Sequence, residues 1–265
     1  MKKSFTEAAI AVYGVAVYLY CLRIFVGLLF FTYSGPKPDA LKIMFPYNVN
    51  GTERADLMTS LMMNTLLLSS FCLQHTIMAR DWFKEKYTAM FPASSERSSY
   101  ILASTLVANA FMNFWHPIMH VIWYVPHPYS YGMCSMWALG SVLVLAATFN
   151  IDHFELFGLR QCINYEYYRA HSTGAFAADY AYKYMRHPMM TGFLLALWFT
   201  PLMTVGQAFL AMLLNTYIFV EVMKFEEPDL VRKLGDTYVQ YKEEVPAFCP
   251  MPGKYYKGAT KSRTD

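Results

Sequence analysis

The sequence predicts an all-α fold, a polytopic bundle of five to six transmembrane segments. Of its 265 residues, 55% are hydrophobic and only 15% are charged, whereas about a quarter of an average soluble chain is charged. The apolar residues gather in stretches of about twenty or more, the length that an α-helix needs to cross a bilayer. Lysine and arginine gather in the segments between alternate stretches, as in many membrane proteins. The lipid bilayer is therefore the first partner that we expect.

Four of the apolar stretches are predicted as single spans. The third is the most polar, because asparagine and histidine side chains are spaced along it. The fourth is slightly short, but it contains no charged residue. The predicted spans are residues 8–33, 57–79, 100–125 and 131–149.

The last apolar stretch, residues 189–223, is predicted as a helical hairpin. Two full crossings need about forty residues, and Pro201 and Gly206 near its middle favour a turn. We therefore expect two helices whose outer ends return to the same side of the membrane. Pro188 suits the first turn of the opening helix, which puts His187 at the N-cap beside free backbone N–H groups.

The distribution of positive charge predicts the orientation. Lysine and arginine precede the first span and follow the second span, the fourth span and the hairpin, while the loop at 126–130 has none. By the positive-inside rule, both chain ends lie on the cytosolic side. Residues 150–188 and 225–265 then share one cytosolic face. The membrane would be the endoplasmic reticulum or nuclear envelope of a eukaryote, or the plasma membrane of a bacterium.

Composition and motifs exclude several classes of function. A net charge of +3 without a basic stripe gives no reason to expect a nucleic-acid partner. The five cysteines are far apart and lack metal-ligand spacing, so we expect no metal. GxGxxG, GxxxxGK[ST] and GxSxG are absent. We expect one integral membrane domain over residues 1–265, whose bundle itself supplies any cofactor pocket; the oligomeric state stays open.

Both ends of the predicted hairpin carry ionisable side chains. Arg186 and His187 precede its first helix, and Glu226 and Glu227 follow its second. Carboxylates at a lipid boundary are costly unless they are paired or used. Two interpretations are equally open from these residues alone: a surface ion pair that anchors the hairpin, or a binding site built where its ends meet.

Other polar residues also have two interpretations. His75 and His116 are most simply hydrogen-bond partners inside the bundle, and the alternative is that they line a pocket together with Gln74. His153 lies in the polar segment that follows the fourth span, where it is either part of a solvated helix end or a base.

Four short motifs near the end of the chain follow one another in a fixed order. They are Arg-His-Pro at 186–188, EExxL from Glu226, GxxYxxY from Gly235 and VPxFxP from Val245. In this order the motifs resemble the isoprenylcysteine carboxyl methyltransferase-like membrane family, over roughly the last eighty residues. The resemblance implies an integral membrane enzyme with S-adenosyl-L-methionine as cofactor.

A narrower resemblance covers most of the chain. QHxxMAR from Gln74, ERSxY from Glu96 and DHFxLFGLRQ from Asp152 look like the nurim-related branch of this family. Within that branch the chain is most similar to the methanethiol S-methyltransferases, which implies methylation of methanethiol to dimethyl sulfide. The alternatives are another acceptor, such as a prenylcysteine carboxylate or a lipid amine, and a non-enzymatic nurim-like membrane protein. A small thiol is favoured because the basic residue used on a prenylated substrate has no clear counterpart.

The resemblance also implies roles for individual residues. Residues 150–250 become the expected cofactor-binding and catalytic region, with Arg186, His187 and His153 as catalytic residues. The matching does not say which glutamate contacts the cofactor, and residues 174–177 occupy the place of another cofactor loop. The expected cofactor-binding residues are Tyr182, His187, Pro188, Met189, Met190, Glu226 and Glu227, and those expected to bind the substrate are Gln74, His75 and His116.

Overall fold

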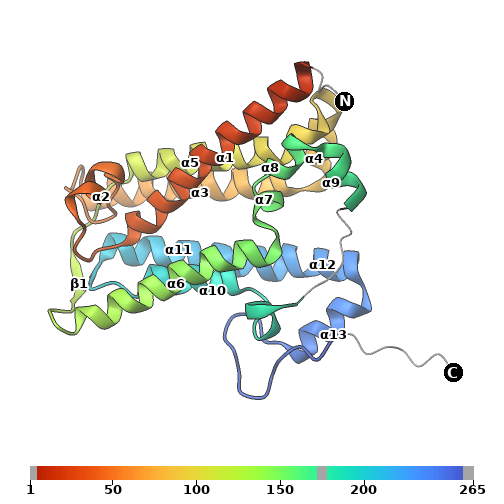
Figure 1. The fold of residues 1–265 in the computed structure, drawn as a ribbon. Helices are drawn as coiled ribbons and strands as arrows, with labels where there is room; N and C mark the ends of the chain where they lie inside the picture. Colours follow the sequence, from red (N-terminus) through yellow and green to blue (C-terminus); the bar gives the residue numbers. More distant parts are fainter. Residues whose placement is uncertain (1–4, 172–177, 259–265) are drawn as a thin grey trace.

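The computed structural model describes residues 5–171 and 178–258 and shows a bundle of antiparallel helices (Figure 1). Within these residues, four helical stretches are long and apolar enough to cross a membrane, which confirms the predicted all-α membrane bundle. They are α1 (Phe5–Thr32), α3 (Leu57–Ala79), α6 (Ser130–Ile151) and the stretch Val205–Leu234, in which α11 (Val205–Glu221), the π-helical turn η3 (Val222–Glu226) and α12 (Glu227–Leu234) follow one another.

Two shorter helices complete the bundle, α5 (Glu96–Phe114) and α10 (Pro188–Trp198). With 11 residues, α10 is about 16 Å long and falls short of the roughly 30 Å hydrocarbon core of a bilayer. It lies along α6, and the two backbones approach closely where Gly140 faces Gly192. Small residues at such a crossing are the usual means of helix packing in membranes.

The predicted third span is wrong in its second half. The helix ends at Phe114, and residues 121–124 form the strand β1 (Val121–Tyr124), which pairs antiparallel with β2 (Leu202–Thr204). Pro117 explains the break, because the residue before a proline is disfavoured in the helical region. Apolar composition alone did not separate the helix from the extended segment.

The predicted hairpin is confirmed as two helices, α10 and α11. Pro188 occupies the first turn of α10 and His187 is its N-cap residue, as expected. The connection between the helices contains β2, and α11 begins where the side chain of Thr204 accepts a hydrogen bond from the backbone N–H of Gln207. This capping satisfies one of the free N–H groups at the helix start.

The two ends of the bundle differ in what they carry (Figure 1). The short helix α2 (Asp39–Met44) and the β1–β2 pair lie at one end, here called the α2 end. The start of α1 lies at the opposite end, here called the α13 end; that this end faces the cytosol stays a prediction. The α13 end also holds α4 (Asp81–Met90), η1 (Ala93–Ser95), α7 (His153–Leu156), α8 (Leu159–Ile163), α9 (Tyr165–His171), η2 (Tyr180–Lys183) and α13 (Asp236–Glu244).

An apolar core joins α1, α3, α5, α10 and α11. Its centre is aromatic: the rings of Phe31 and Phe111 meet edge to face at 5.6 Å between centroids, and Trp115 packs against both. Edge-to-face packing adds to the free energy gained by burying these rings. The core therefore holds together the helices that carry the α13 end.

A fully buried asparagine fastens the chain where α5 ends. Asn64 of α3 accepts a hydrogen bond from the backbone N–H of His116 at 2.8 Å and donates one to its carbonyl at 2.7 Å. Asn64→Leu leaves both backbone groups unpaired, so we expect a loss of about 2 kcal/mol in the free energy of unfolding. Thermal unfolding of detergent-solubilised protein measures it.

Thr65→Ala is the matched control for this change. Thr65 is exposed, and among the described residues its hydroxyl bonds only to the Leu61 carbonyl of its own helix, so its removal is expected to leave the unfolding temperature nearly unchanged. Equal unfolding temperatures for Asn64→Leu and Thr65→Ala would contradict the role given to Asn64.

Candidate active site

The two ends of the α10–α11 hairpin meet at one buried carboxylate. Glu227, the first residue of α12, is 1% exposed. Its Oε1 accepts hydrogen bonds from Arg186 Nε at 2.8 Å and from His187 Nε2 at 3.1 Å, and it lies 2.7 Å from Arg186 Nη2. The predicted encounter of these side chains is present, and it is not a surface ion pair, because Arg186 is also only 9% exposed.

The π-helical turn η3 directs three nearby glutamates to different partners. Before it, Glu221 pairs at 2.5 Å with Arg80, the C-cap residue of α3. After it, Glu227 faces Arg186 and His187. Glu226, the last residue of η3, is 41% exposed at its side chain and lies 3.7 Å from His187 Nδ1. Such turns shift the register of a helix and are frequent at functional sites.

The C-terminal segment completes this cluster. Lys242 of α13 places Nζ 2.9 Å from Glu227 Oε2. The backbone N–H groups of Arg186 and His187 donate to the carbonyls of Pro246 and Ala247, each at 2.9 Å. Here the tail motif found in the sequence lies directly against the Arg-His-Pro motif. The cluster of Arg186, His187, Glu226, Glu227 and Lys242 is called the hairpin cluster below.

Arg186 is fully engaged inside the hairpin cluster. Its Nη1 donates to the carbonyls of Lys242, at 3.0 Å, and Val245, while its other two guanidinium nitrogens face Glu227. A guanidinium held on all three nitrogens fixes the geometry around it. Arg186 therefore holds the start of α10 against α13 and the tail.

Three tyrosines support the cluster: Tyr238 and Tyr241 of α13 are buried, and Tyr182 of η2 is half-buried. Tyr241 donates its hydroxyl to the carbonyl of Tyr182 at 2.6 Å, and Tyr238 and Tyr241 pack together with a centroid distance of 5.7 Å. Burial raises the pKa of Tyr182, Tyr238 and Tyr241 well above the usual value. All three phenols are therefore neutral, and they act here as packing and hydrogen-bonding groups.

The other residues expected to bind the cofactor lie around the start of α10. Tyr182 is in η2, and Met189 and Met190 follow Pro188 in the first turn of α10, where both are half-buried. Residues 174–177, which were expected to form a cofactor loop, lie outside the described residues. Sequence reasoning missed Lys242; its position one residue after the GxxYxxY motif is the signal that could have found it.

His153 lies apart from the hairpin cluster. It is 4% exposed, with Nε2 2.9 Å from the Tyr18 hydroxyl and Nδ1 2.8 Å from the Thr148 hydroxyl. Burial lowers the pKa of His153, so its imidazole is neutral at pH 7. In the described part of the chain, no hydrogen bond, ion pair or ring contact joins it to the cluster. Its geometry is that of a residue that fastens α7 to α1 and α6.

The three residues expected to bind the acceptor are divided between the two ends of the bundle. Gln74 and His75 lie near the α13 end of α3, where both reach the Ser104 hydroxyl and His75 also contacts the Tyr100 hydroxyl. His116 lies beside Asn64, eleven residues back along α3 and thus about 16 Å away. The structure does not bring His116 to the other two.

A polar track leads from His75 toward the hairpin cluster. The His75 ring lies 6.5 Å from that of Tyr217 on α11, whose hydroxyl is 3.1 Å from Thr76. Thr76 donates to Glu221 at 3.0 Å, and Glu221 immediately precedes η3. Polar side chains inside a membrane bundle usually pair with one another and often mark a pathway.

Comparison with curated proteins assigns the chain to a family. A methanethiol S-methyltransferase of Crocosphaera subtropica is 38% identical over 213 residues, which are 80% of this chain and 83% of the relative. That of Mycobacterium tuberculosis is 37% identical over 248 residues, 92% of this chain and 97% of the relative. The chain belongs to the methanethiol S-methyltransferase family. This confirms the resemblance inferred from the motifs.

A more distant likeness extends beyond the methanethiol S-methyltransferases. Nurim of Xenopus laevis is 30% identical over 163 residues, 57% of this chain and 56% of that protein. No family model matches the chain, and no solved structure matches it. The curated methanethiol S-methyltransferases confirm the expected enzyme class, and the protein is a membrane methyltransferase. Its similarity to nurim covers less of the chain, at lower identity.

Proposed function

We propose that this protein transfers a methyl group from S-adenosyl-L-methionine to methanethiol and so forms dimethyl sulfide. The acceptor proposed is the one in the names of the curated relatives. The hairpin cluster is the observation that supports a donor site. In it, Glu226 of η3 lies 3.7 Å from His187, the N-cap residue of α10. Residues 150–250 form the proposed cofactor-binding and catalytic region.

The residues of the hairpin cluster suit this donor. Bound there, the donor would supply an electrophilic methyl group on a sulfonium, together with an amine and a carboxylate. Glu226 keeps 41% of its side chain exposed, so we assign it, rather than Glu227, to the donor's amine or ribose. The free N–H groups at the start of α10 suit the carboxylate. Glu227 and Arg186 act as positioning residues.

The chemical step needs little beyond placement and proton removal. A donor held by Glu226 and the start of α10 would present its methyl carbon to the thiolate of methanethiol; the new carbon–sulfur bond would form as the sulfonium bond broke, and the donor sulfur would be released as a neutral thioether. His187, whose Nδ1 faces Glu226 at 3.7 Å, is the base that we assign to the thiol proton. His153 is fully engaged with Tyr18 and Thr148, so we give it a positioning role.

The acceptor and the donor are proposed to arrive from different directions. A small lipophilic thiol reaches Gln74 and the polar track that begins at His75 from the bilayer, while the polar donor enters at the α13 end. We assign the α13 end to the cytosolic side, where the positive-inside rule also predicts both chain ends. His116 lies beside Asn64, about 16 Å along α3 from His75, and is too far away to take part.

Headspace analysis tests the reaction. Membranes containing the wild-type protein, supplied with methanethiol and S-adenosyl-L-methionine, are expected to release dimethyl sulfide, and His187→Ala is expected to reduce the rate at least about a hundredfold because it removes the base and disturbs Glu226. Glu166→Gln, an exposed change on α9, is the control with an unchanged rate.

The same assay separates the proposal from its alternatives. Methyl transfer to a prenylcysteine or a lipid amine without dimethyl sulfide would show a different acceptor. Absence of any transfer by protein that is folded and inserted would favour a non-enzymatic role. Wild-type turnover by His187→Ala would contradict the placement of the reaction at the hairpin cluster.

A further inference from the structure

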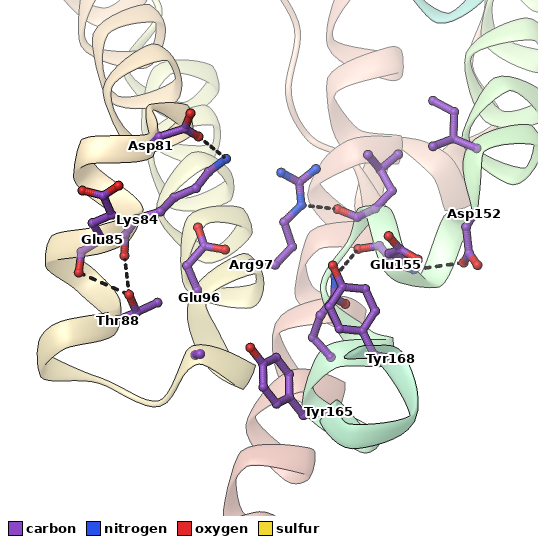
Figure 2. A pocket seen from close by; sticks show the side chains of 14 residues that line it. Asp81, Lys84, Glu85, Thr88, Glu96, Arg97, Asp152, Glu155, Tyr165 and Tyr168 are labelled. Atoms are coloured by element: carbon purple, nitrogen blue, oxygen red, sulfur yellow. Dashed lines mark hydrogen bonds and ion pairs between the residues drawn. The ribbon is translucent and has the colours of Figure 1, made fainter. Parts of the chain in front are cut away.

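A second site lies at the α13 end, away from the hairpin cluster. A cavity of about 620 Å³ opens between α4 on one side and α7 to α9 on the other, and none of the hairpin-cluster residues lines it (Figure 2). Glu85 and Thr88 project from α4, while Asp152 and Tyr168 stand on the opposite wall. The proposed methyl transfer makes no use of this cavity.

The lining of the cavity is acidic. Five carboxylate side chains and only two cationic ones face it. Two of the carboxylates are already paired: Asp81 with Lys84 at 3.7 Å and with Arg232 at 3.8 Å, and Asp152 with Arg160 at 2.8 Å. Arg97 donates from Nε to the carbonyl of Leu156 at 2.8 Å. In the described residues, Glu85 and Glu96 have no cationic partner. A concave site with excess negative charge concentrates cations from solution.

Gln161 adds an independent sign of a missing donor. Its side chain lines the cavity and is only 6% exposed. The Nε2 group donates to the carbonyl of Glu155 at 3.1 Å, which fixes the orientation of the amide. Its Oε1 is buried and accepts no hydrogen bond in the described structure. A buried acceptor without a donor is costly, and a ligand N–H in the cavity would satisfy it.

The walls of the cavity are locked together by two sequence motifs that the hairpin cluster leaves unused. Gly158 has φ = 80°, and a Cβ there would lie 2.6 Å from the backbone nitrogen of Ser98, so only glycine fits. Ser98 donates its hydroxyl to the Gly158 carbonyl at 3.1 Å. ERSxY at the start of α5 and DHFxLFGLRQ of α7 and α8 therefore form one rigid, preorganised wall.

Two tyrosines give the cavity an aromatic side. Tyr165 and Tyr168 of α9 line it with ring centroids 6.1 Å apart. Aromatic faces beside carboxylates attract organic cations. The described residues contain no group of three histidine, cysteine or acidic side chains placed to hold a metal ion, which favours an organic cation over a divalent metal.

We propose that this cavity binds a small organic polycation of the polyamine class. Its ammonium groups would face Glu85 and Glu96, which stand on different helices, and one N–H would reach Gln161 Oε1. A single-charge amine would leave one of these carboxylates without a partner, whereas a chain of separated ammonium groups satisfies both.

Calorimetric titration with spermidine tests this site. The full-length protein is held in nanodiscs of zwitterionic phosphatidylcholine, so that the lipid itself does not collect the polycation. Saturable binding with one site per chain is expected for the wild type. Glu85→Gln combined with Glu96→Gln should raise Kd at least about tenfold, because it removes two charge-assisted contacts and keeps the side-chain shape. Gln161→Met should also raise Kd.

Glu166→Gln is the matched control, because Glu166 is exposed on α9 and does not line the cavity. Its Kd is expected to equal that of the wild type. The proposal is overturned if the wild type shows no saturable binding, if Glu166→Gln weakens binding as much as the double variant, or if Mg²⁺ at equal ionic strength displaces spermidine completely. Should Gln161→Met fail to fold, the double variant decides. No donor or thiol is present, so the outcome is independent of methyl transfer.

Discussion

Glu227→Gln is expected to destabilise the α13 end by about 3 kcal/mol. A neutral amide leaves the Arg186 guanidinium, 9% exposed, without its counter-charge, and removing one partner of a buried ion pair costs about 3–5 kcal/mol. We take the lower end of this range because Lys242, the other cation on Glu227, is 36% exposed and retains contact with water. Thermal unfolding in detergent, followed by circular dichroism, measures the effect.

Glu226→Gln is the matched control on the neighbouring residue. Its carboxylate is 41% exposed and lies 3.7 Å from His187, so its neutralisation is expected to change the unfolding temperature little while weakening donor binding. The pair thus separates a residue that holds the site together from one that contacts the ligand. Equal stability losses in the two variants would contradict this division of roles.

Gly192→Ala is expected to force α10 away from α6. A Cβ at this position would lie 2.6 Å from the carbonyl oxygen of Gly140 and 2.8 Å from the backbone nitrogen of Val144. Because backbone atoms of α6 cannot move aside as a side chain does, the cost should reach about 3 kcal/mol, the upper end for overpacking. His187 caps α10, so methyl transfer should fall as well. Unfolding temperature and headspace rate report the two effects.

Gly132→Ala provides the comparison on α6, the helix against which Gly192 packs. Within the described part of the chain, a Cβ at Gly132 has no neighbour closer than 4 Å, and alanine is the better helix former by about 0.5–1 kcal/mol. The variant is expected to be as stable as the wild type or slightly more stable. If it lost as much stability as Gly192→Ala, a general intolerance of larger residues, rather than the α6–α10 contact, would explain both.

Hydropathy predicted the membrane bundle and the hairpin. A long apolar stretch with Pro201 and Gly206 near its middle favours two helices joined by a turn over one continuous helix. Hydropathy failed for the segment after Phe114. Apolar residues at 115–125 read as a continuation of the helix, yet Pro117 and pairing with residues 202–204 turn them into an extended segment and a strand. That pairing joins residues about eighty positions apart, and local composition carries no signal for it.

The meeting of Arg186 and His187 with the two glutamates followed from the hairpin alone. The choice between Glu226 and Glu227 did not, because it depends on the π-helical turn η3, which the sequence analysis did not predict. The exposed fraction of each side chain distinguishes the two roles. Glu227 is 1% exposed and pairs with Arg186, whereas the side chain of Glu226 is 41% exposed and accessible to a ligand. Lys242 was missed because its side chain reaches the site from α13, outside the hairpin.

The acceptor residues show a further limit of sequence reasoning. Polar residues inside apolar stretches were the only signal for Gln74, His75 and His116. That signal does not predict how deep in the membrane each residue lies. The structure places His116 with Asn64 and leaves His75 beside Tyr217. Likewise, ERSxY and DHFxLFGLRQ stood out in the sequence, but only the fold shows that they build one acidic cavity.

Equilibrium binding of radiolabelled S-adenosyl-L-methionine tests most directly whether the hairpin ends hold the methyl donor. We expect saturable binding by the wild type, its loss in His187→Ala protein that still inserts and folds, and wild-type affinity in the Glu85→Gln and Glu96→Gln double variant. Binding retained by His187→Ala and lost by the double variant would contradict the account, since it would place the donor in the acidic cavity between α4 and α9.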